Sequence, residues 1–479
     1  MRNELTFEQG RDIGLKFVLD MLEPASPYGA KLLKDLRFYK ASEKAELDGE
    51  LDNVSVMLTA LENEHDKVSA VRHTLSAMRD VSGTIKNCSD GVLTEIDLFE
   101  LTALLLRLKE LIPLAESLPG YESMTGARLE EVDAPLAVLD PEGNGRLRFF
   151  VEDTRTPQLM RLRLRKRELE KSLYMPDADK DLILSERMLV TSREEQELLS
   201  IYAVMTDSLR PMLPILNRNI AAVGRLDVAI SKALLARRFS GTRPETGGDS
   251  LLLEEAVNPE IAQTLKQDGR SFTPITVDLP RGVTILTGAN MGGKSVAIKT
   301  IALNIVLALT GFFVFAAKAK IPVFDHTELI NRDFSSVSGG LSSFGGEILR
   351  FNDALKRLGG GDLSFIAMDE FARGTNSEEG AAIVRGVVRY LNDSNAVTIL
   401  ATHYDGAAEF ASRRYQVRGL RSLEENAPVK EGDAAAYVAE HMDYGLMRID
   451  KNADCPREAL LICRLLRMDE ELIGIIEEG

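Results

Sequence analysis

The clearest chemical signature in this chain is a glycine-rich octapeptide that ends in Lys-Ser. It reads Gly288-Ala289-Asn290-Met291-Gly292-Gly293-Lys294-Ser295 and fits the pattern G-x-x-x-x-G-K-[ST] at every required position. In such loops backbone N–H groups surround phosphate oxygens, the lysine reaches the outer phosphates, and the hydroxyl contacts Mg²⁺. The pattern therefore predicts a nucleoside triphosphate site. The alternative is a glycine-rich turn in which Lys-Ser occurs by chance.

The elements on either side of this loop favour the phosphate site. Gly282–Thr287 is β-branched and apolar, as expected of a buried parallel strand, and residues 296–309 have a helical pattern. A strand, a glycine loop and a helix N-terminus in this order place converging N–H groups and the positive end of a helix dipole at the phosphates. These flanks make a chance turn the weaker interpretation.

A second motif supplies two adjacent carboxylates. Residues 365–368 are apolar and lead into Asp369-Glu370. At the end of a strand, Asp369 can hold Mg²⁺ through water, and Glu370 can orient and deprotonate an attacking water. An acidic loop that merely follows a strand is the alternative, but a phosphate loop upstream favours ATP hydrolysis.

A third apolar run, residues 397–401, ends in Thr402-His403. A neutral histidine at this position can hydrogen-bond the γ-phosphate or the attacking water and so sense the nucleotide. A single histidine at a strand end is more often structural. The other two motifs, expected at the same sheet edge, favour the sensor role for His403.

Residues 335–347, which include Ser342, are rich in Ser and Gly and lead into a helix. Hydroxyls and N–H groups at a helix N-terminus form an anion-binding surface. Because the phosphate loop already surrounds the triphosphate of its own subunit, this second surface is expected to close on the nucleotide of a partner subunit. A flexible surface loop is the alternative.

The composition indicates a globular protein of several domains. The chain has 479 residues, 44% of them hydrophobic and 28% charged, with a net charge of −16 that argues against a broadly cationic surface. Its three cysteines have no C-x-x-C spacing, so reduced thiols in the cytoplasm are expected rather than a zinc site. Residues 301–317 are nearly all apolar, but Asn304 and Thr310-Gly311 interrupt them, which favours a buried helix followed by a strand over a membrane span.

The pattern changes near residue 240. Residues 1–240 have helical periodicity, except near 135–153, where two apolar runs flank a Pro/Gly/Asn turn and predict a small hairpin. The segment 241–250 is rich in Gly, Thr and Pro and is expected to be a linker. Beyond it, short β-branched runs alternate with helical ones, as in a parallel α/β sheet. The fold class expected is multidomain, α and α/β.

These motifs resemble the ATPase domain of the MutS family of DNA mismatch-recognition proteins. The family's TG-x-NMGGKS appears at residues 287–295, its DE-x-x-RGT at 369–375, its ATHY at 401–404, and its S-[ST]-F at 342–344, with Glu347 also matching. The NMGGK core and the RGT after D-E are specific to this family among phosphate-loop ATPases. Residues 26–33 and the region near 139–143 are similar to the start of the family's helical core and to its lever and clamp.

The resemblance implies an ABC-class ATP hydrolase that works as a homodimer around its nucleotides. Lys294 and Ser295 would come from one subunit and Ser342 from the other, while Asn290 would also contact the γ-phosphate. Phe272 stands where family members place an aromatic that stacks on adenine, although Pro274 disturbs the match. The implied domains are a core and lever region at 1–240, the ATPase domain at 251–454, and a C-terminal helical segment for dimerisation at 455–479.

Departures from the family leave two functions open. The chain starts at the helical core, so the mismatch-reading domains are expected to be absent, and no endonuclease domain is expected after the ATPase domain. One function is a clamp on duplex or branched DNA, supported by the basic residues between Arg161 and Arg167; the alternative for that run is a solvated helix face paired with Glu168 and Glu170. The other is a protein-remodelling ATPase that reactivates a client such as a cobalamin-dependent aminomutase, which the acidic composition and the Asn-x-Glu-Glu-Gly run after RGT favour. No membrane partner is expected.

Overall fold

The computed structural model describes residues 5–176, 179–288, 293–330, 343–358, 361–404, 406–420, 442–450, 463–464 and 468–478. It divides into two compact units. The sheet unit contains residues 1–23, 35–58 and 231–479, and the helical unit contains residues 24–34 and 59–230. The sequence placed the division near 240. Two N-terminal stretches instead belong to the sheet unit because they bond to it; for example, Gln9 Nε2 donates to Leu329 O at 3.0 Å.

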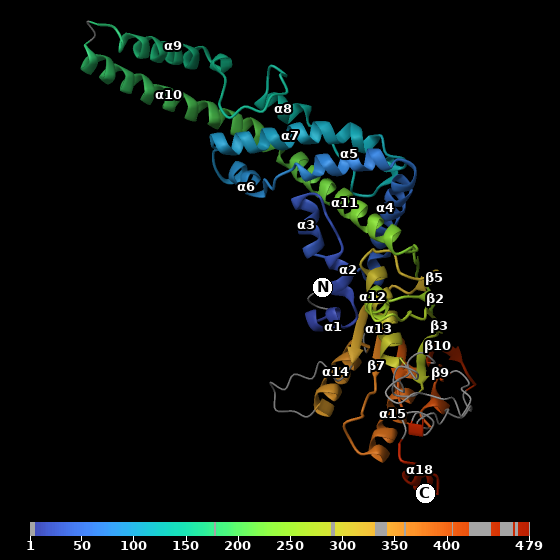
Figure 1. The fold of residues 1–479 in the computed structure, drawn as a ribbon. Coiled ribbons are helices and arrows are strands. Elements are labelled where there is room, and N and C mark those ends of the chain that lie inside the picture. The colour runs from blue at the N-terminus through green and yellow to red at the C-terminus, as the bar shows by residue number, and fades with distance from the viewer. Residues whose placement is uncertain are drawn as a thin grey trace. The chain divides into compact units, whose positions relative to one another are not determined.

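A six-stranded sheet forms the centre of the sheet unit (Figure 1). Its strand order is β10 (Met442–Arg448), β9 (Arg413–Leu420), β4 (Gly282–Thr287), β8 (Ala396–Ala401), β7 (Ser364–Asp369) and β6 (His326–Ile330). All neighbours are parallel except β10, which pairs antiparallel with β9. The parallel α/β sheet expected from the sequence is present, with one antiparallel edge strand added. The central strands are covered on both faces, as Ile285 of β4, Ile366 of β7 and Leu400 of β8 are fully buried.

A second, four-stranded sheet corrects the expected linker. Its order is β1 (Glu245–Thr246), β5 (Lys318–Ile321), β2 (Leu251–Ala256) and β3 (Ile275–Leu279). The segment 241–250 is part of it: β1 pairs with β5, and Thr242 bridges Val314. Its Gly and Pro residues mark turns into a short edge strand rather than a free connection, because an edge strand needs hydrogen bonds on one side only. Residues 312–315, expected as a strand, contribute only that bridge.

The helix that follows the phosphate loop is α13 (Lys294–Leu309). Residues 300–309 of α13 are all buried, as expected of a core helix. No helix in the described ranges has an apolar stretch long enough to cross a membrane.

The C-terminal end of α13 is held by a buried lysine of α11 (Leu213–Arg238). Lys232 Nζ donates to Thr310 O and Gly311 O, each at 3.0 Å, and lies 4.3 Å from the centre of the Phe312 ring. Burial lowers the pKa of Lys232 to about 8, which the charge of Glu50 opposes. A cation at a helix C-terminus satisfies its last carbonyls, so Lys232 fixes the end of α13 that lies away from the loop.

The other regular elements of the described chain are helices. The sheet unit also contains α1 (Phe7–Asp12), α2 (Leu15–Asp20), α12 (Pro259–Gln267), α14 (Ser343–Leu358), α15 (Ser377–Asn392) and α18 (Glu470–Glu478). The helical unit contains α3 (Pro27–Lys34), α5 (His65–Ser76), α6 (Ser82–Asp90), α7 (Glu95–Glu116), α8 (Asp133–Leu139), α9 (Pro157–Ser172) and α10 (Lys180–Leu209), while α4 (Lys44–Asn63) and α11 cross the division. Short 3₁₀ turns are η1 (Ala41–Glu43), η2 (Tyr121–Ser123), η3 (Asp153–Arg155), η4 (Arg210–Met212) and η7 (Ala408–Phe410).

The hairpin expected near 135–153 is wrong. The first apolar run is the helix α8, and residues 140–152 contain no strand. Asp140 explains the difference, because its carboxylate accepts hydrogen bonds from Asn144 N at 3.1 Å and Gly145 N at 2.7 Å. A side chain that satisfies these N–H groups replaces the cross-strand bonds on which a hairpin depends.

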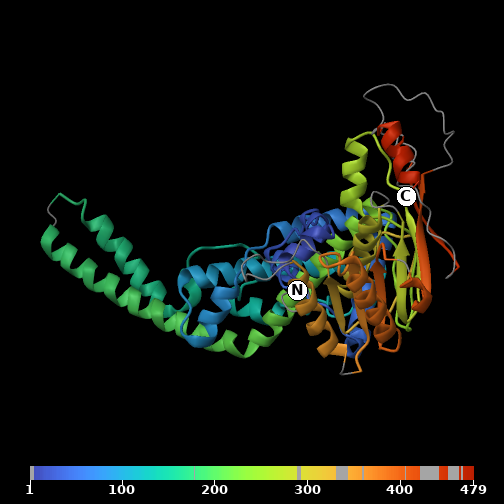
Figure 2. The same cartoon turned by 90° about the horizontal axis from the view of Figure 1, so that it is seen from below.

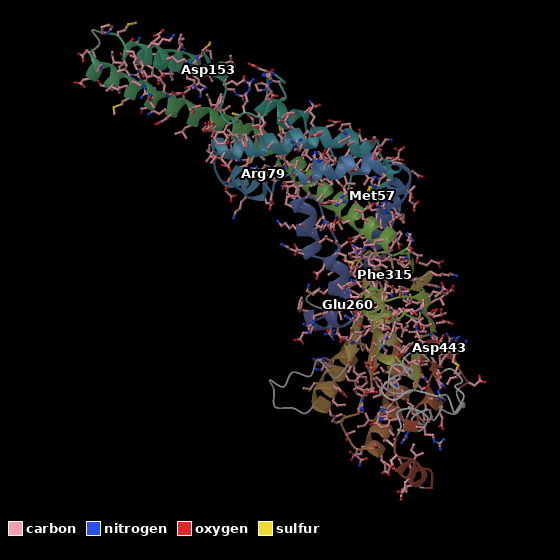
Figure 3. All side chains as sticks on the ribbon, in the orientation of Figure 1. Met57, Arg79, Asp153, Glu260, Phe315 and Asp443 are labelled. Carbon is pink, nitrogen blue, oxygen red and sulfur yellow. The ribbon has the colours of Figure 1, made fainter. Side chains whose placement is uncertain are left out.

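The basic run lies on α9, which packs side by side with α10, as Figures 1 and 2 show. Most of its charges are neutralised by acidic residues of α9, α10 and η3. Arg163 bonds to Asp153 at 2.8 Å and to Glu194 at 2.9 Å, and Asp153 is labelled beside α9 in Figure 3. The remaining pairs are Arg165 with Glu168 and Glu186, Lys166 with Glu194, and Arg167 with Asp153. The alternative interpretation, a helix face paired with acidic residues, therefore describes this run better than a free cationic patch.

A buried carboxylate holds the start of α3 in the helical unit. Asp227 on α11 accepts hydrogen bonds from Ala25 N, Ser26 N and Ser26 Oγ at 2.9, 2.7 and 2.6 Å. We expect Asp227→Asn to lower the free energy of unfolding by about 1–3 kcal/mol, because an amide group turns one acceptor into a donor that faces another donor. Urea unfolding at pH 7 measures the change, and the fully exposed Asp66→Asn is the control. Equal stability of both variants would show that this cap is dispensable.

Candidate nucleotide site

The three sequence motifs meet at one edge of the six-stranded sheet. Strands β4, β8 and β7 are parallel neighbours, and Ala401 at the end of β8 is in register with both Leu286 and Asp369. The segments that leave these strands at their carboxyl ends therefore lie side by side. They contain Gly288, Glu370 and His403. Because ligands of open α/β sheets bind at this edge, the arrangement fits a nucleotide site.

The described part of the phosphate loop has the backbone of an anion site. Gly288 has φ 136° and Gly293 has φ 87°, both in the region that favours glycine, and a Cβ on Gly288 would lie 3.1 Å from Val417 Cβ. Gly293 is the N-cap of α13, so the loop opens directly onto a helix N-terminus. Lys294 is 4% exposed, and its Nζ donates to Gly288 O at 2.7 Å. The ammonium is thus held over the loop.

A pocket of about 380 Å³ opens beside this loop. Phe272, Lys294, Ser295 and Glu370 line it together, along with Ile261, Leu265, Arg270, Thr273, Ile275, Gly293, Val296, Ala297 and Tyr444. The lining combines an aromatic ring and aliphatic side chains with a lysine, a serine and a glutamate, which suits a ligand with both a base and phosphates. Phe272 thus shares a pocket with Lys294 and Ser295, and its role of stacking on adenine stays a prediction.

Tyr444 is a pocket residue that sequence reasoning missed. It lies on β10, next to Asp443, which is labelled in Figure 3. A Cβ on Gly293 would lie 2.9 Å from Tyr444 Cδ1, so the tyrosine ring packs against the loop and position 293 has no space for a side chain. No sequence signal links Tyr444 to Gly293, because the two residues are far apart along the chain.

Asp369 lies at the end of β7 and is partly buried. Burial raises the pKa of Asp369, and a hydrogen bond with Ser295 opposes that rise. Its Oδ1 is buried without a hydrogen-bond partner among the described residues. A buried carboxylate oxygen without a partner, next to a hydroxyl, fits the oxygen ligands that Mg²⁺ takes. Asp369 does not itself line the pocket formed by the described residues.

Glu370 follows directly and reaches the pocket. Its N–H donates to Ala401 O at 3.0 Å, which ties it to β8, and its φ is 53°. Its carboxylate forms an ion pair with Arg373. The side chain is 19% exposed, so it is shielded from solvent while facing the pocket.

His403 stands two residues beyond β8 and is exposed. Its ring centroid lies 4.3 Å from that of Tyr404. Within the described part of the chain it shares the sheet edge with Glu370 but does not line the pocket. Ala289, Asn290, Met291 and Gly292 of the phosphate loop, and Ser342, lie outside the described residues. Their predicted roles stay predictions.

Comparisons with known proteins agree with this site. Residues 284–458 match the family described as MutS domain V. The chain is 32% identical over 200 residues to a DNA mismatch repair protein MutS of Natronomonas pharaonis, which is 41% of this chain and 23% of that protein. It is 36% identical over 185 residues to the protein of the same name from Haloquadratum walsbyi, covering 38% and 19%. For the Aquifex pyrophilus protein the identity is 30% over 315 residues, 62% of this chain and 35% of the relative.

The matched stretch contains the phosphate loop, the acidic pair and His403, which the geometry brings to one sheet edge. The chain spans about a quarter or less of the length of the first two relatives. The family assignment therefore rests on the nucleotide site and its sheet. The comparisons therefore support a MutS-like ATPase domain over residues 284–458 of this chain.

Proposed function

We propose that this protein binds and hydrolyses ATP at a composite site between two copies and uses the closure of that site to drive a clamp-like change on DNA. One observation carries the nucleotide part. Phe272, Lys294, Ser295 and Glu370 line one pocket, although they come from three separate parts of the sequence. The DNA part is supported by relatives that are named DNA mismatch repair proteins.

The proposed chemistry assigns one task to each described side chain. Phe272 stacks on the adenine, and Lys294 neutralises the outer phosphates. Glu370 accepts the proton of a water whose oxygen bonds to the γ-phosphorus while the bond from that phosphorus to ADP breaks. His403 senses the γ-phosphate, and Ser342 of a second copy completes the site.

Mg²⁺ fits the oxygen donors next to this pocket. Ser295 and Asp369, which are already hydrogen-bonded to each other, would hold the ion. When bound, Mg²⁺ neutralises phosphate charge and so favours attack on the γ-phosphate. The buried Oδ1 of Asp369 is the observation that supports this assignment.

The DNA part predicts that ATP turnover rises with duplex or branched DNA and that the rise disappears steeply as salt increases.

On α9, Arg161 and Lys171 have no ion pair with any described residue. We therefore expect Arg161→Gln with Lys171→Gln to reduce the log–log salt slope of DNA binding by about two. Arg165→Gln is the matched control, because Arg165 is already paired with Glu186. Turnover indifferent to DNA at every salt concentration would contradict this part and favour the remodelling of a protein client.

A further inference from the structure

The loop that carries Glu370 has an unusual backbone. Glu370 has φ 53° and Ala372 has φ 63°, and neither is glycine. A left-handed conformation costs a residue with a Cβ roughly 1–2 kcal/mol, so two of them within three residues need restraints from the surrounding structure. Between them, Phe371 is 1% exposed and packs on Phe351 of α14, with ring centroids 5.4 Å apart.

Two side chains supply such restraints from opposite sides of Ala372. Its N–H donates to Glu347 Oε2 at 3.1 Å, and its carbonyl accepts a hydrogen bond from Tyr404 Oη at 3.0 Å. Glu347 belongs to α14 and is 3% exposed. Tyr404 follows β8 and stands next to His403. Both polar groups of one residue are thus held by side chains from two other elements.

The space for the tyrosine contact depends on a glycine. A Cβ on Gly380 of α15 would lie 2.3 Å from Tyr404 Oη and 3.1 Å from Ala372 O. Any side chain at position 380 would therefore displace the hydroxyl from the carbonyl. Gly380 is the last residue of the Asn-x-Glu-Glu-Gly run. The contact with Tyr404 explains why a residue without a side chain stands there.

We propose that Glu347 and Tyr404 are positioning residues for Glu370. Holding Ala372 at both polar groups fixes the left-handed backbone on each side of Phe371, and that backbone aims the Glu370 carboxylate into the pocket. The inference rests on the proposed role of Glu370 as the base. Since neither side chain lines the pocket among the described residues, both act on the chemical step rather than on nucleotide affinity.

Tyr404→Phe tests the tyrosine, because it removes only the hydroxyl and retains the ring. We expect kcat for ATP to fall about tenfold while KM changes less than about twofold. Tyr390→Phe, an exposed tyrosine on α15, is the control and should leave both values unchanged. A wild-type kcat in Tyr404→Phe would overturn the proposal for the tyrosine.

The glutamate is tested with a pair of variants. Glu347→Met keeps the length but loses the acceptor oxygen, so kcat should fall with unchanged KM, while Glu347→Gln keeps an acceptor and should restore most of the rate. Equal rates in both variants would overturn the hydrogen bond as the cause. If Glu347→Met does not fold, the tyrosine series still decides the proposal.

A double variant separates this inference from the proposed function. In the Glu370→Gln background, Tyr404→Phe should cause no further loss of rate, because the group that it positions is gone. A further tenfold loss would show that Tyr404 acts through another group, such as His403. Normal turnover of Glu370→Gln alone would refute the proposed function itself, whereas a slow Glu370→Gln with a normal Tyr404→Phe refutes only the positioning role.

Discussion

Glu370→Gln should bind ATP with the affinity of the unaltered protein and hydrolyse it at least about 100-fold more slowly. The amide has the same size as the carboxylate and can still hydrogen-bond a water, but it cannot accept a proton at neutral pH. The pocket and the backbone bond from Glu370 N to Ala401 O do not depend on the lost charge. The expected result is therefore a defect in the chemical step alone.

Two measurements together test this result. Equilibrium titration with a fluorescent ATP analogue gives the affinity, and single-turnover hydrolysis gives the rate of the chemical step without product release. Glu378→Gln is the control, since it neutralises an exposed carboxylate in the first turn of α15. If Glu370→Gln hydrolyses ATP at the normal rate, another group activates the water. Loss of affinity along with rate would point instead to a collapsed loop.

The Arg373 ion pair affects how this variant is interpreted. In the structure the Glu370 carboxylate forms an ion pair with the Arg373 guanidinium, so one of its oxygens already has a partner. Arg373 is 44% exposed, so this pair is solvent-screened and easily exchanged. The Glu370 carboxylate is released when Arg373 binds another anion instead. The phosphates of the nucleotide would be such an anion.

Local patterns explain why much of the site could be located from the sequence. The strand Gly282–Thr287 has the extent expected, and the helix begins at Lys294, two residues before the expected pattern, because a fully buried strand and a glycine loop are encoded by adjacent residues. The same holds for β7 and β8, whose apolar runs end at Asp369 and Ala401. Parallel pairing then brings the three strand ends together without further information.

Contacts between distant segments explain what could not be located. Tyr444 reaches Gly293 from the antiparallel edge strand, and the side chains of Glu347 and Tyr404 bond to the backbone of Ala372 from separate segments. The hairpin near 135–153 failed for a different reason. Two apolar runs around a turn are compatible with a hairpin and also with a helix followed by a loop. The hydrogen bonds that Asp140 accepts from Asn144 N and Gly145 N favour the loop. The ion pairs of α9 likewise depend on Glu186 and Glu194 of α10. The sequence of α9 alone does not indicate that these residues lie opposite it.

Lys294→Ala should lose at least about 100-fold in ATP affinity, which corresponds to about 2.8 kcal/mol at 1.4 kcal/mol per tenfold change. Lys294 is 4% exposed and its ammonium lies within bonding distance of Gly288 O, so its charge acts on the loop with little screening by water. An anion that enters this loop meets the lysine and the N-terminus of α13 together. Without the lysine, only the dipole and the backbone N–H groups remain to offset the charge of the phosphates.

Lys266→Ala provides the matched comparison, because it removes an exposed lysine from α12, the helix that contributes Ile261 and Leu265 to the same pocket. Calorimetric titration with ATP and Mg²⁺ should give wild-type affinity for Lys266→Ala and a signal too weak to fit for Lys294→Ala. Thermal unfolding of both variants shows that the protein is folded. ADP affinity should fall less than ATP affinity, because the lysine acts on the outermost phosphates. A folded Lys294→Ala that still binds ATP tightly would refute the role of Lys294 in holding the triphosphate.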